Sequence, residues 1–267
     1  YLSDSTNFEK YRIPDDASVA AGSYVTFDES QFNPNGEWNP ERGAQGATEF
    51  SFSGTRGDQV YLVQADASGN LIRVVDHVEF GPTRSGESIG LWTDEDGVFA
   101  PMASFTSGAT NSGPRIGPVV ITEIMYNPGT MINASELEFI EIHNSGTSNE
   151  NLDAWSLETA VSYSFPQDTN LAAGSYLLVV GFDPADTTKL SAFQTQYGTD
   201  SSLTLLGPWS GSLNNGGETI QLKRRDLTGD QLTDTNTGDT YYPLIIEDDW
   251  TFVTRNSVDF RGAASRP

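Results

Sequence analysis

Acidic and amide side chains on two short turns are the residues of this sequence best suited to metal chemistry. The segments Asp226-Leu-Thr-Gly-Asp230 and Asp234-Thr-Asn-Thr-Gly-Asp239 bring several oxygen donors close together along the chain. Oxygen donors of this kind are the ligands that calcium prefers. We therefore expect Asp226, Asp230, Asp234, Asn236 and Asp239 to hold a structural calcium ion. The alternative is that each aspartate closes its own turn through side-chain hydrogen bonds.

The sequence evidence for a catalytic site is weaker than that for a metal site. The two histidines, His77 and His143, lie in no Gly-x-Ser-x-Gly elbow and share no repeated motif. Glu136, Glu138 and Glu141 crowd one predicted strand, whereas glycoside hydrolysis needs two carboxylates that face each other across a cleft. Acids that alternate along one strand are typical of a solvated face. The sequence therefore predicts a protein that is not an enzyme.

A tryptophan in an apparent loop is the best candidate for contact with sugars. Pro208-Trp209-Ser-Gly would present the indole of Trp209 to solvent, where an aromatic face can stack on a sugar ring. Packing of Trp209 in the core is the alternative. Trp209 is thus a candidate ligand-binding residue, and polysaccharide is a candidate partner.

The charge balance excludes some partners. The 267 residues carry 37 acidic and 14 basic side chains, for a net charge of −23. Such a surface repels phosphate backbones and anionic lipid, so we expect no nucleic-acid partner. No apolar run approaches the length that spans a bilayer, which predicts no membrane insertion. There are no cysteines, so disulfide and thiolate chemistry are excluded.

Short apolar runs separated by turn residues predict an all-β fold. A single helix is expected from Pro184 to Tyr197, with Asp183 as its cap. Residues 64–71 read as a hairpin loop with Gly69 at positive φ. The clearest strands are expected at residues 23–27, 59–64, 71–75, 118–124, 137–142, 176–180, 219–223 and 242–246.

Three blocks of sequence occur twice in the same order. An internal repeat of this kind predicts two copies of one domain. The Gly/Ser/Pro-rich segment between them is typical of a linker. We expect a first β-sandwich over residues 1–111, a linker over 112–118, and a second β-sandwich over 119–267. The matching blocks are Tyr11-Arg-Ile-Pro14 with Tyr163-Ser-Phe-Pro166, Ala20-Ala-Gly-Ser-Tyr-Val25 with Ala172-Ala-Gly-Ser-Tyr-Leu177, and Gly57-Asp-Gln-Val-Tyr-Leu62 with Gly217-Glu-Thr-Ile-Gln-Leu222.

The second copy resembles a known family. Val119-Val-Ile-Thr-Glu-Ile-Met-Tyr-Asn-Pro128, Glu138-Phe-Ile-Glu-Ile-His-Asn144 and Leu152-Asp-Ala-Trp-Ser-Leu157 follow one another as in the opening of a bacterial lamin tail domain. The resemblance covers residues 118–250 and implies an immunoglobulin-like β-sandwich without catalytic residues. The first copy resembles the later part of the same domain and lacks a counterpart of residues 119–155. We expect chain that precedes Tyr1 to complete it, with strand donation by a neighbouring subunit or by residues 251–267 as alternatives.

The family resemblance also implies a function. Bacterial members are repeated modules of large exported or surface proteins. We therefore expect a non-catalytic structural or adhesive module of an extracellular or cell-surface protein, whose partners are neighbouring protein domains or subunits. The alternative is a carbohydrate-binding accessory segment of a secreted polysaccharide-acting enzyme. An exposed pair of aromatic side chains on one face would favour the alternative.

Overall fold

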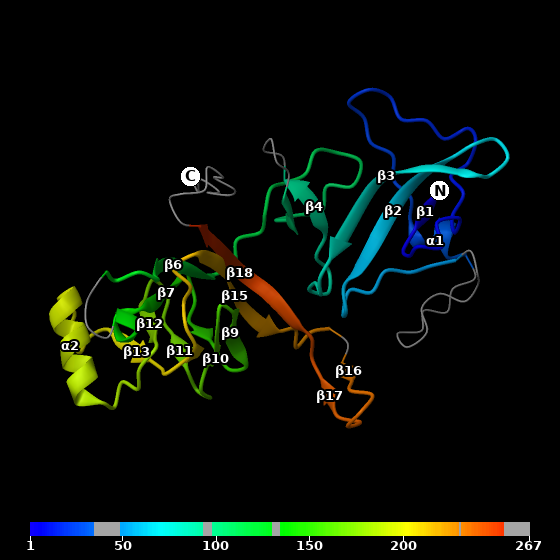
Figure 1. The fold of residues 1–267 in the computed structure, drawn as a ribbon. Coiled ribbons are helices and arrows are strands. Elements are labelled where there is room, and N and C mark those ends of the chain that lie inside the picture. The colour runs from blue at the N-terminus through cyan, green and yellow to red at the C-terminus, as the bar shows by residue number, and fades with distance from the viewer. Residues whose placement is uncertain (35–48, 93–97, 130–133, 230, 254–267) are drawn as a thin grey trace. The chain divides into compact units, whose positions relative to one another are not determined.

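The fold was analysed in a computed structural model, which describes residues 1–34, 49–92, 98–129, 134–229 and 231–253 (Figure 1). The chain is mostly β-strand and divides into two compact units. Unit 1 comprises Tyr1–Arg115 and Asp226–Ile245, and unit 2 comprises Ile116–Arg225 and Ile246–Pro267. The chain passes from unit 1 to unit 2 within the segment expected as a linker. The return of residues 226–245 to unit 1 is a feature that the sequence did not predict.

Unit 2 is a two-layered β-sandwich. One layer has the strand order β13-β12-β7-β6 and the other the order β14-β10-β9-β15-β18. A pair of short strands, β8 and β11, lies beside them. The elements are β6 (Val119–Met125), a 3-10 helix (Ala134–Leu137), β7 (Phe139–Asn144), β8 (Glu150–Asn151), β9 (Trp155–Thr159), β10 (Val161–Ser164), β11 (Asn170–Leu171), β12 (Tyr176–Val180), α2 (Thr187–Tyr197), β13 (Thr204–Leu206), β14 (Ser210–Gly211), β15 (Gly217–Arg225) and β18 (Leu244–Val253).

The core of unit 2 lies between its two layers. Alternate residues of β6, β7 and β12 meet alternate residues of β9, β10 and β15, and Trp155 fills part of the space, as its size predicts. Phe139 on β7 points the other way, into a second cluster that α2 covers with Phe193. The strand β7 is therefore buried on both faces, as expected for consecutive apolar residues.

The helix α2 begins later than the sequence predicts. It starts at Thr187, and the Asp186 carboxylate caps it by accepting hydrogen bonds from Thr188 N (3.0 Å) and Lys189 N (3.3 Å). The expected cap, Asp183, instead accepts a hydrogen bond from Ala185 N in the turn before the helix. Either aspartate satisfies the local pattern, so the sequence alone does not choose between them.

In the part of the chain that the structure describes, unit 1 contains one three-stranded sheet, β1-β2-β3, and two separate antiparallel pairs, β4-β5 and β16-β17. A bridge between Leu2 and Tyr11 extends the sheet beyond β1. Phe32, Phe50 and Phe52 form an aromatic cluster near Tyr11. The elements are β1 (Leu2–Ser3), α1 (Glu29–Phe32), β2 (Asp58–Ala65), β3 (Leu71–Phe80), β4 (Ile89–Trp92), β5 (Val98–Pro101), β16 (Leu232–Thr233) and β17 (Thr240–Tyr241).

The two units share a strand register. In unit 1, Leu2 pairs with Leu62 on one side and with Tyr11 on the other. In unit 2, Leu157 pairs with Leu222 and with Tyr163. The repeated sequence blocks align Tyr11 with Tyr163 and Leu62 with Leu222, so the strand pair β1-β2 and the bridge to Tyr11 in unit 1 have the same pairing as β9-β15 and β10 in unit 2.

A turn is also repeated. Ser23 N donates to Ala20 O (2.9 Å) in unit 1, and Ser175 N donates to Ala172 O (3.0 Å) in unit 2. Gly22 and Gly174 in these turns have φ of 73° and 71°, which favours glycine. The strand expected over residues 23–27 does not form, although its counterpart is β12. A strand needs a hydrogen-bonded neighbour, and β12 has β7 and β13 beside it, whereas no described strand pairs with residues 23–27.

Candidate functional site

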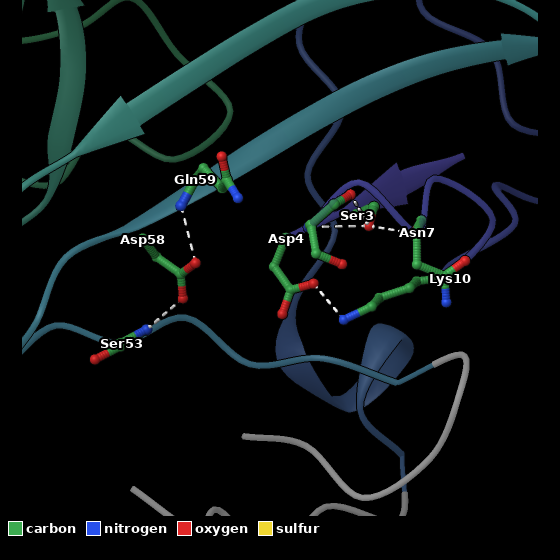
Figure 2. Close-up of polar contacts among 8 residues, drawn as sticks. Ser3, Asp4, Asn7, Lys10, Ser53, Asp58 and Gln59 are labelled. Carbon is green, nitrogen blue, oxygen red and sulfur yellow. Dashed lines mark hydrogen bonds and ion pairs between the residues drawn. The ribbon is translucent and has the colours of Figure 1, made fainter. Parts of the chain in front are cut away.

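Polar side chains at the beginning of unit 1 serve the fold (Figure 2). The buried Ser3 hydroxyl donates to the carbonyls of Ser5 (2.9 Å) and Asn7 (2.7 Å), and Asp4 forms an ion pair with Lys10. Asp58 accepts hydrogen bonds from the backbone N of Ser53 and of Gln59, both over 2.9 Å. These groups close the loops next to β1 and β2 through contacts within unit 1.

Asp226, one of the expected calcium ligands, is buried and anchors a turn. Its carboxylate accepts hydrogen bonds from Thr228 Oγ1 (2.7 Å), Thr228 N (3.1 Å) and Ser85 N (3.1 Å). Burial alone would raise the pKa of Asp226, but these hydrogen bonds and the nearby Arg84 outweigh it and lower the pKa. Asp226 is therefore ionised at neutral pH.

The other expected calcium ligands do not gather around Asp226. Asp234 accepts hydrogen bonds from Asn236 N (2.7 Å) and Thr237 N (3.3 Å), which closes a turn of its own. Asn236 and Asp239 are exposed, and Asp230 lies outside the described residues. Across the described ranges, no three His, Cys, Asp or Glu side chains come close enough together to hold a metal ion. Calcium binding in this hairpin stays a prediction.

The expectation for Trp209 is wrong. Its side chain is 7% exposed and belongs to the core between the two layers of unit 2, so its ring offers no face to a sugar. A local sequence of Pro-Trp-Ser-Gly predicts a loop, but it does not predict how deep the loop lies. Trp92 in unit 1 and Trp250 in unit 2 are the described tryptophans with substantial exposure, and Trp38 lies outside the described residues.

The three glutamates that crowd the β7 region have three different environments. Glu136 pairs with Lys189 (2.9 Å), and Glu141 accepts a hydrogen bond from Thr122 Oγ1 (2.7 Å). Glu138 departs from the expected solvated face, because it is buried beneath the loop that contains Leu213. Burial raises the pKa of Glu138, and the nearby Glu218 adds to the effect.

Each histidine stacks on a tyrosine across an antiparallel strand pair. The ring centroids of Tyr61 and His77 are 4.1 Å apart in unit 1, and those of His143 and Tyr176 are 4.0 Å apart in unit 2. His143 Nδ1 also lies 3.1 Å from Ser175 O. Both rings thus make cross-strand packing contacts, which agrees with a structural role for both histidines.

A buried carboxylate that the sequence analysis missed lies at Glu247 in unit 2. Its Oε2 lies 3.0 Å from Nε of Arg224, so the two side chains form an ion pair. The geometry at Nε does not meet the criteria for a hydrogen bond. The Arg224 guanidinium lies 5.7 Å from the centre of the Trp155 ring. On the neighbouring residue Asp248, the carboxylate accepts a hydrogen bond from Ile121 N (2.8 Å), which ties β18 to the edge strand β6 of the other layer.

These contacts hold the two units' own strands and turns together. Asp226, Asp234, the three glutamates of the β7 region, both histidines and Trp209 contact the protein's own backbone, side chains or core. A functional site needs groups that converge on a space for a ligand. In the described residues, no helix is both long enough and apolar enough to cross a membrane.

Comparison with known proteins places a family domain on unit 2 and its flanks. Residues 113–241 match the family described as Lamin Tail Domain. An uncharacterised protein of Sinorhizobium fredii, y4eN, is 68% identical over 25 residues. That stretch is 9% of this chain and 24% of the relative, so this chain spans about a quarter of the relative's length. The family match confirms the resemblance of the second copy and its immunoglobulin-like fold.

Proposed function

Because residues 113–241 match the Lamin Tail Domain, we propose that this chain is a non-catalytic structural module built from two lamin-tail copies. The first copy lies in unit 1. The module acts within a larger extracellular or cell-surface protein, and its partners are neighbouring domains or subunits. The acidic surface, with a net charge of −23, suits a saline exterior.

One observation carries the proposal of two copies. Tyr11, Leu2 and Leu62 in unit 1 have the same strand pairing as Tyr163, Leu157 and Leu222 in unit 2. A one-residue slip would turn every side chain to the other face of the sheet, so equal register over a strand pair and an adjoining bridge supports a common fold for the two units. The repeated turn at Gly22 and Gly174 adds independent support.

A structural role is supported by what the polar side chains contact. Asp226, Glu247 and Asn144 are buried and bind groups of the same unit. The candidate sugar-stacking residue, Trp209, is in the core, which removes the strongest argument for carbohydrate binding.

A replacement experiment tests this function. In the source organism, the segment that encodes residues 1–267 is replaced by an unrelated pair of β-sandwich domains of similar length. If the chain is a structural module, we expect the parent protein to keep its export, its surface display and its phenotype after the replacement. Loss of the phenotype with export intact would show that this chain supplies a specific activity and would contradict the proposal.

A further inference from the structure

A turn of two asparagines and two glycines leads into β15. Residues 214–217 read Asn-Asn-Gly-Gly, and Gly217 N donates to Asn214 O (3.1 Å) across the turn. This hydrogen bond places Asn215 and Gly216 at the two central positions of a β-turn. Both residues are exposed, whereas Leu213 directly before the turn is 5% exposed and packs in the core of unit 2. An exposed Asn-Gly bond therefore lies at the boundary of the core.

An Asn-Gly pair can react with itself in water. The backbone nitrogen after the asparagine gives up its proton to solvent base and attacks the side-chain Cγ. The new C–N bond closes a five-membered succinimide, and the amide nitrogen takes up a proton and leaves as ammonia. Water then opens the ring at one of its two carbonyls and leaves aspartate or isoaspartate. Glycine in the second position favours the attack, because it has no Cβ to crowd the nitrogen and it reaches the required backbone dihedrals freely.

Asn215 is the asparagine that glycine follows in the part of the chain that the structure describes. Exposed asparagines elsewhere, such as Asn149 and Asn170, are followed by glutamate and leucine, whose side chains hinder the attack. The sequence has a second Asn-Gly pair, Asn35-Gly36, which lies outside the described residues. Among the described residues, the reaction is therefore expected first at Asn215.

The folded turn holds the reacting nitrogen. Gly216 N donates to the side-chain Oδ1 of Asn214 (2.7 Å), so its proton is engaged by the neighbouring residue and shielded from solvent base. Asn214 is itself fixed, because its backbone N donates to the Glu218 carboxylate. Attack on Asn215 therefore requires the hydrogen bond at Gly216 N to open. An exposed turn opens locally, without unfolding of the core.

The products of the reaction disturb the start of β15. Leu213 N donates to the buried Glu138 carboxylate (3.4 Å), whose pKa is raised by burial and also by the nearby Glu218. A further carboxylate at residue 215 adds repulsion to this pair. Isoaspartate also inserts one extra backbone carbon into a turn whose ends are tied together by the hydrogen bond from Gly217 N. Both changes act directly beside a core residue, so they weaken the packing of unit 2.

We propose that Asn215 is a self-modification site, at which the side chain cyclises onto Gly216 N and is converted to aspartate and isoaspartate, and that Asn214 sets the rate by holding this nitrogen. Water is the co-reactant and ammonia is the leaving group, so the reaction requires no second protein. Each converted chain carries one more negative charge. The converted fraction grows with the age of the folded protein, and the start of β15 is less stable in older molecules.

Peptide mapping of the full chain during incubation at mildly alkaline pH tests the site. Trypsin releases residues 190–223, which contain Asn215, and residues 116–189, which contain Asn149 and Asn170. We expect the first peptide to convert with time, with fragmentation spectra that place aspartate and isoaspartate at residue 215, while the second peptide stays unchanged. Gly216→Ala should abolish conversion over the same period. A Cβ there would lie 3.0 Å from Asn214 Oδ1, at the end of a side chain that can adjust, so this variant should fold.

Substitution of Asn214 tests how the rate is set. Asn214→Ala should speed conversion of the folded chain about fivefold, the factor equivalent to one net hydrogen bond. In urea the natural chain and this variant should convert at equal rates, because the unfolded chain does not form the turn. Ser212→Ala, at another exposed position of the same loop, is the matched control and should keep the natural rate. Circular dichroism checks that each variant folds.

Three results would overturn the proposal: no conversion at residue 215, conversion that persists in Gly216→Ala, or equal rates in the folded natural chain and folded Asn214→Ala. The effect on stability is measured separately. The urea midpoint of the converted chain should lie below that of freshly prepared chain, since both products weaken the start of β15. Equal midpoints would overturn the expected weakening of unit 2.

Discussion

Arg224 and Glu247 form an ion pair across β15 and β18 in which the Glu247 side chain is completely buried and Arg224 is 28% exposed. Removing one partner of a buried pair is costly because the other charge stays in the interior. Arg224→Met should therefore lower the free energy of unfolding by about 3 kcal/mol, the low end of the range for such pairs, since Arg224 keeps some solvent. Urea denaturation followed by near-ultraviolet circular dichroism measures the change. The double variant Arg224→Met/Glu247→Leu should recover most of the loss, and a double variant no more stable than the single one would contradict this account.

Gly117 is expected to tolerate no side chain. A Cβ at this position would lie 2.2 Å from Glu247 Oε1 and 2.8 Å from its Cδ. The carboxylate is buried and paired with Arg224, so it has little freedom to move away. Gly117→Ala should destabilise unit 2 by about 1–3 kcal/mol, the usual effect of overpacking. Gly81→Ala is the control, because a Cβ there meets nothing within 4 Å. Equal melting temperatures of the two variants would show that the Glu247 side chain can move away from the added Cβ.

The strands that the sequence predicted correctly are those whose partners lie in the same unit. Residues 59–64 and 176–180 alternate or run apolar and lie in strands of the structure, and the expected strand 118–124 is β6, which begins one residue later at Val119. Residues 23–27 are also rich in aromatic and β-branched residues, and they form no strand in the structure. Local sequence reports the propensity of a segment, whereas a strand also requires a neighbour that local sequence does not specify.

The residues that sequence analysis misjudged depend on contacts between distant segments. Trp209 reads as a loop residue, and its burial follows from the packing of two sheets. Glu247 reads as one acid among several in Glu247-Asp-Asp249, and only the pairing of β15 with β18 brings Arg224 to it. The acidic turns were recognised as turns, but their convergence on a cation depends on a tertiary arrangement that composition does not determine.

Asn144 is expected to be the polar residue of unit 2 most sensitive to truncation. Asn144→Ala removes the amide that donates to Leu171 O and Ser148 O inside a fully buried site. Carbonyls left without a donor cost about 1–3 kcal/mol, and the loss should appear in the free energy of unfolding. Asn149→Ala is the matched control, because Asn149 accepts one hydrogen bond from Ala173 N at an exposed position. A comparable decrease in the free energy of unfolding in both variants would show that the burial of Asn144 does not determine the effect of its truncation.

Glu138 is expected to make stability fall as the pH rises. Burial raises the pKa of Glu138 in the folded state above its ordinary value, so the folded protein binds its proton more tightly than the unfolded chain does. This contribution to stability is complete below the unfolded pKa and is lost as the pH rises through the folded pKa. Glu138→Gln keeps an acceptor for Leu213 N and removes the charge. The variant should gain stability relative to the natural chain at neutral pH and lose that advantage in acid. A pH-independent difference in urea midpoints between the two proteins would contradict the raised pKa.

Salt should stabilise the fold, and calcium should do so beyond its ionic strength. With a net charge of −23, screening by NaCl reduces self-repulsion in the compact state, so the melting temperature should rise with salt. A cation bound by the folded hairpin of residues 226–239 would add stabilisation by linkage. Millimolar calcium should therefore raise the melting temperature more than sodium of equal ionic strength. Asp234→Asn/Asp239→Asn should abolish the calcium increment and preserve the sodium response. Asp200→Asn, in another exposed turn that Ser202 N closes, should preserve both. Identical curves for calcium and sodium would remove the specific site and leave the screening effect standing.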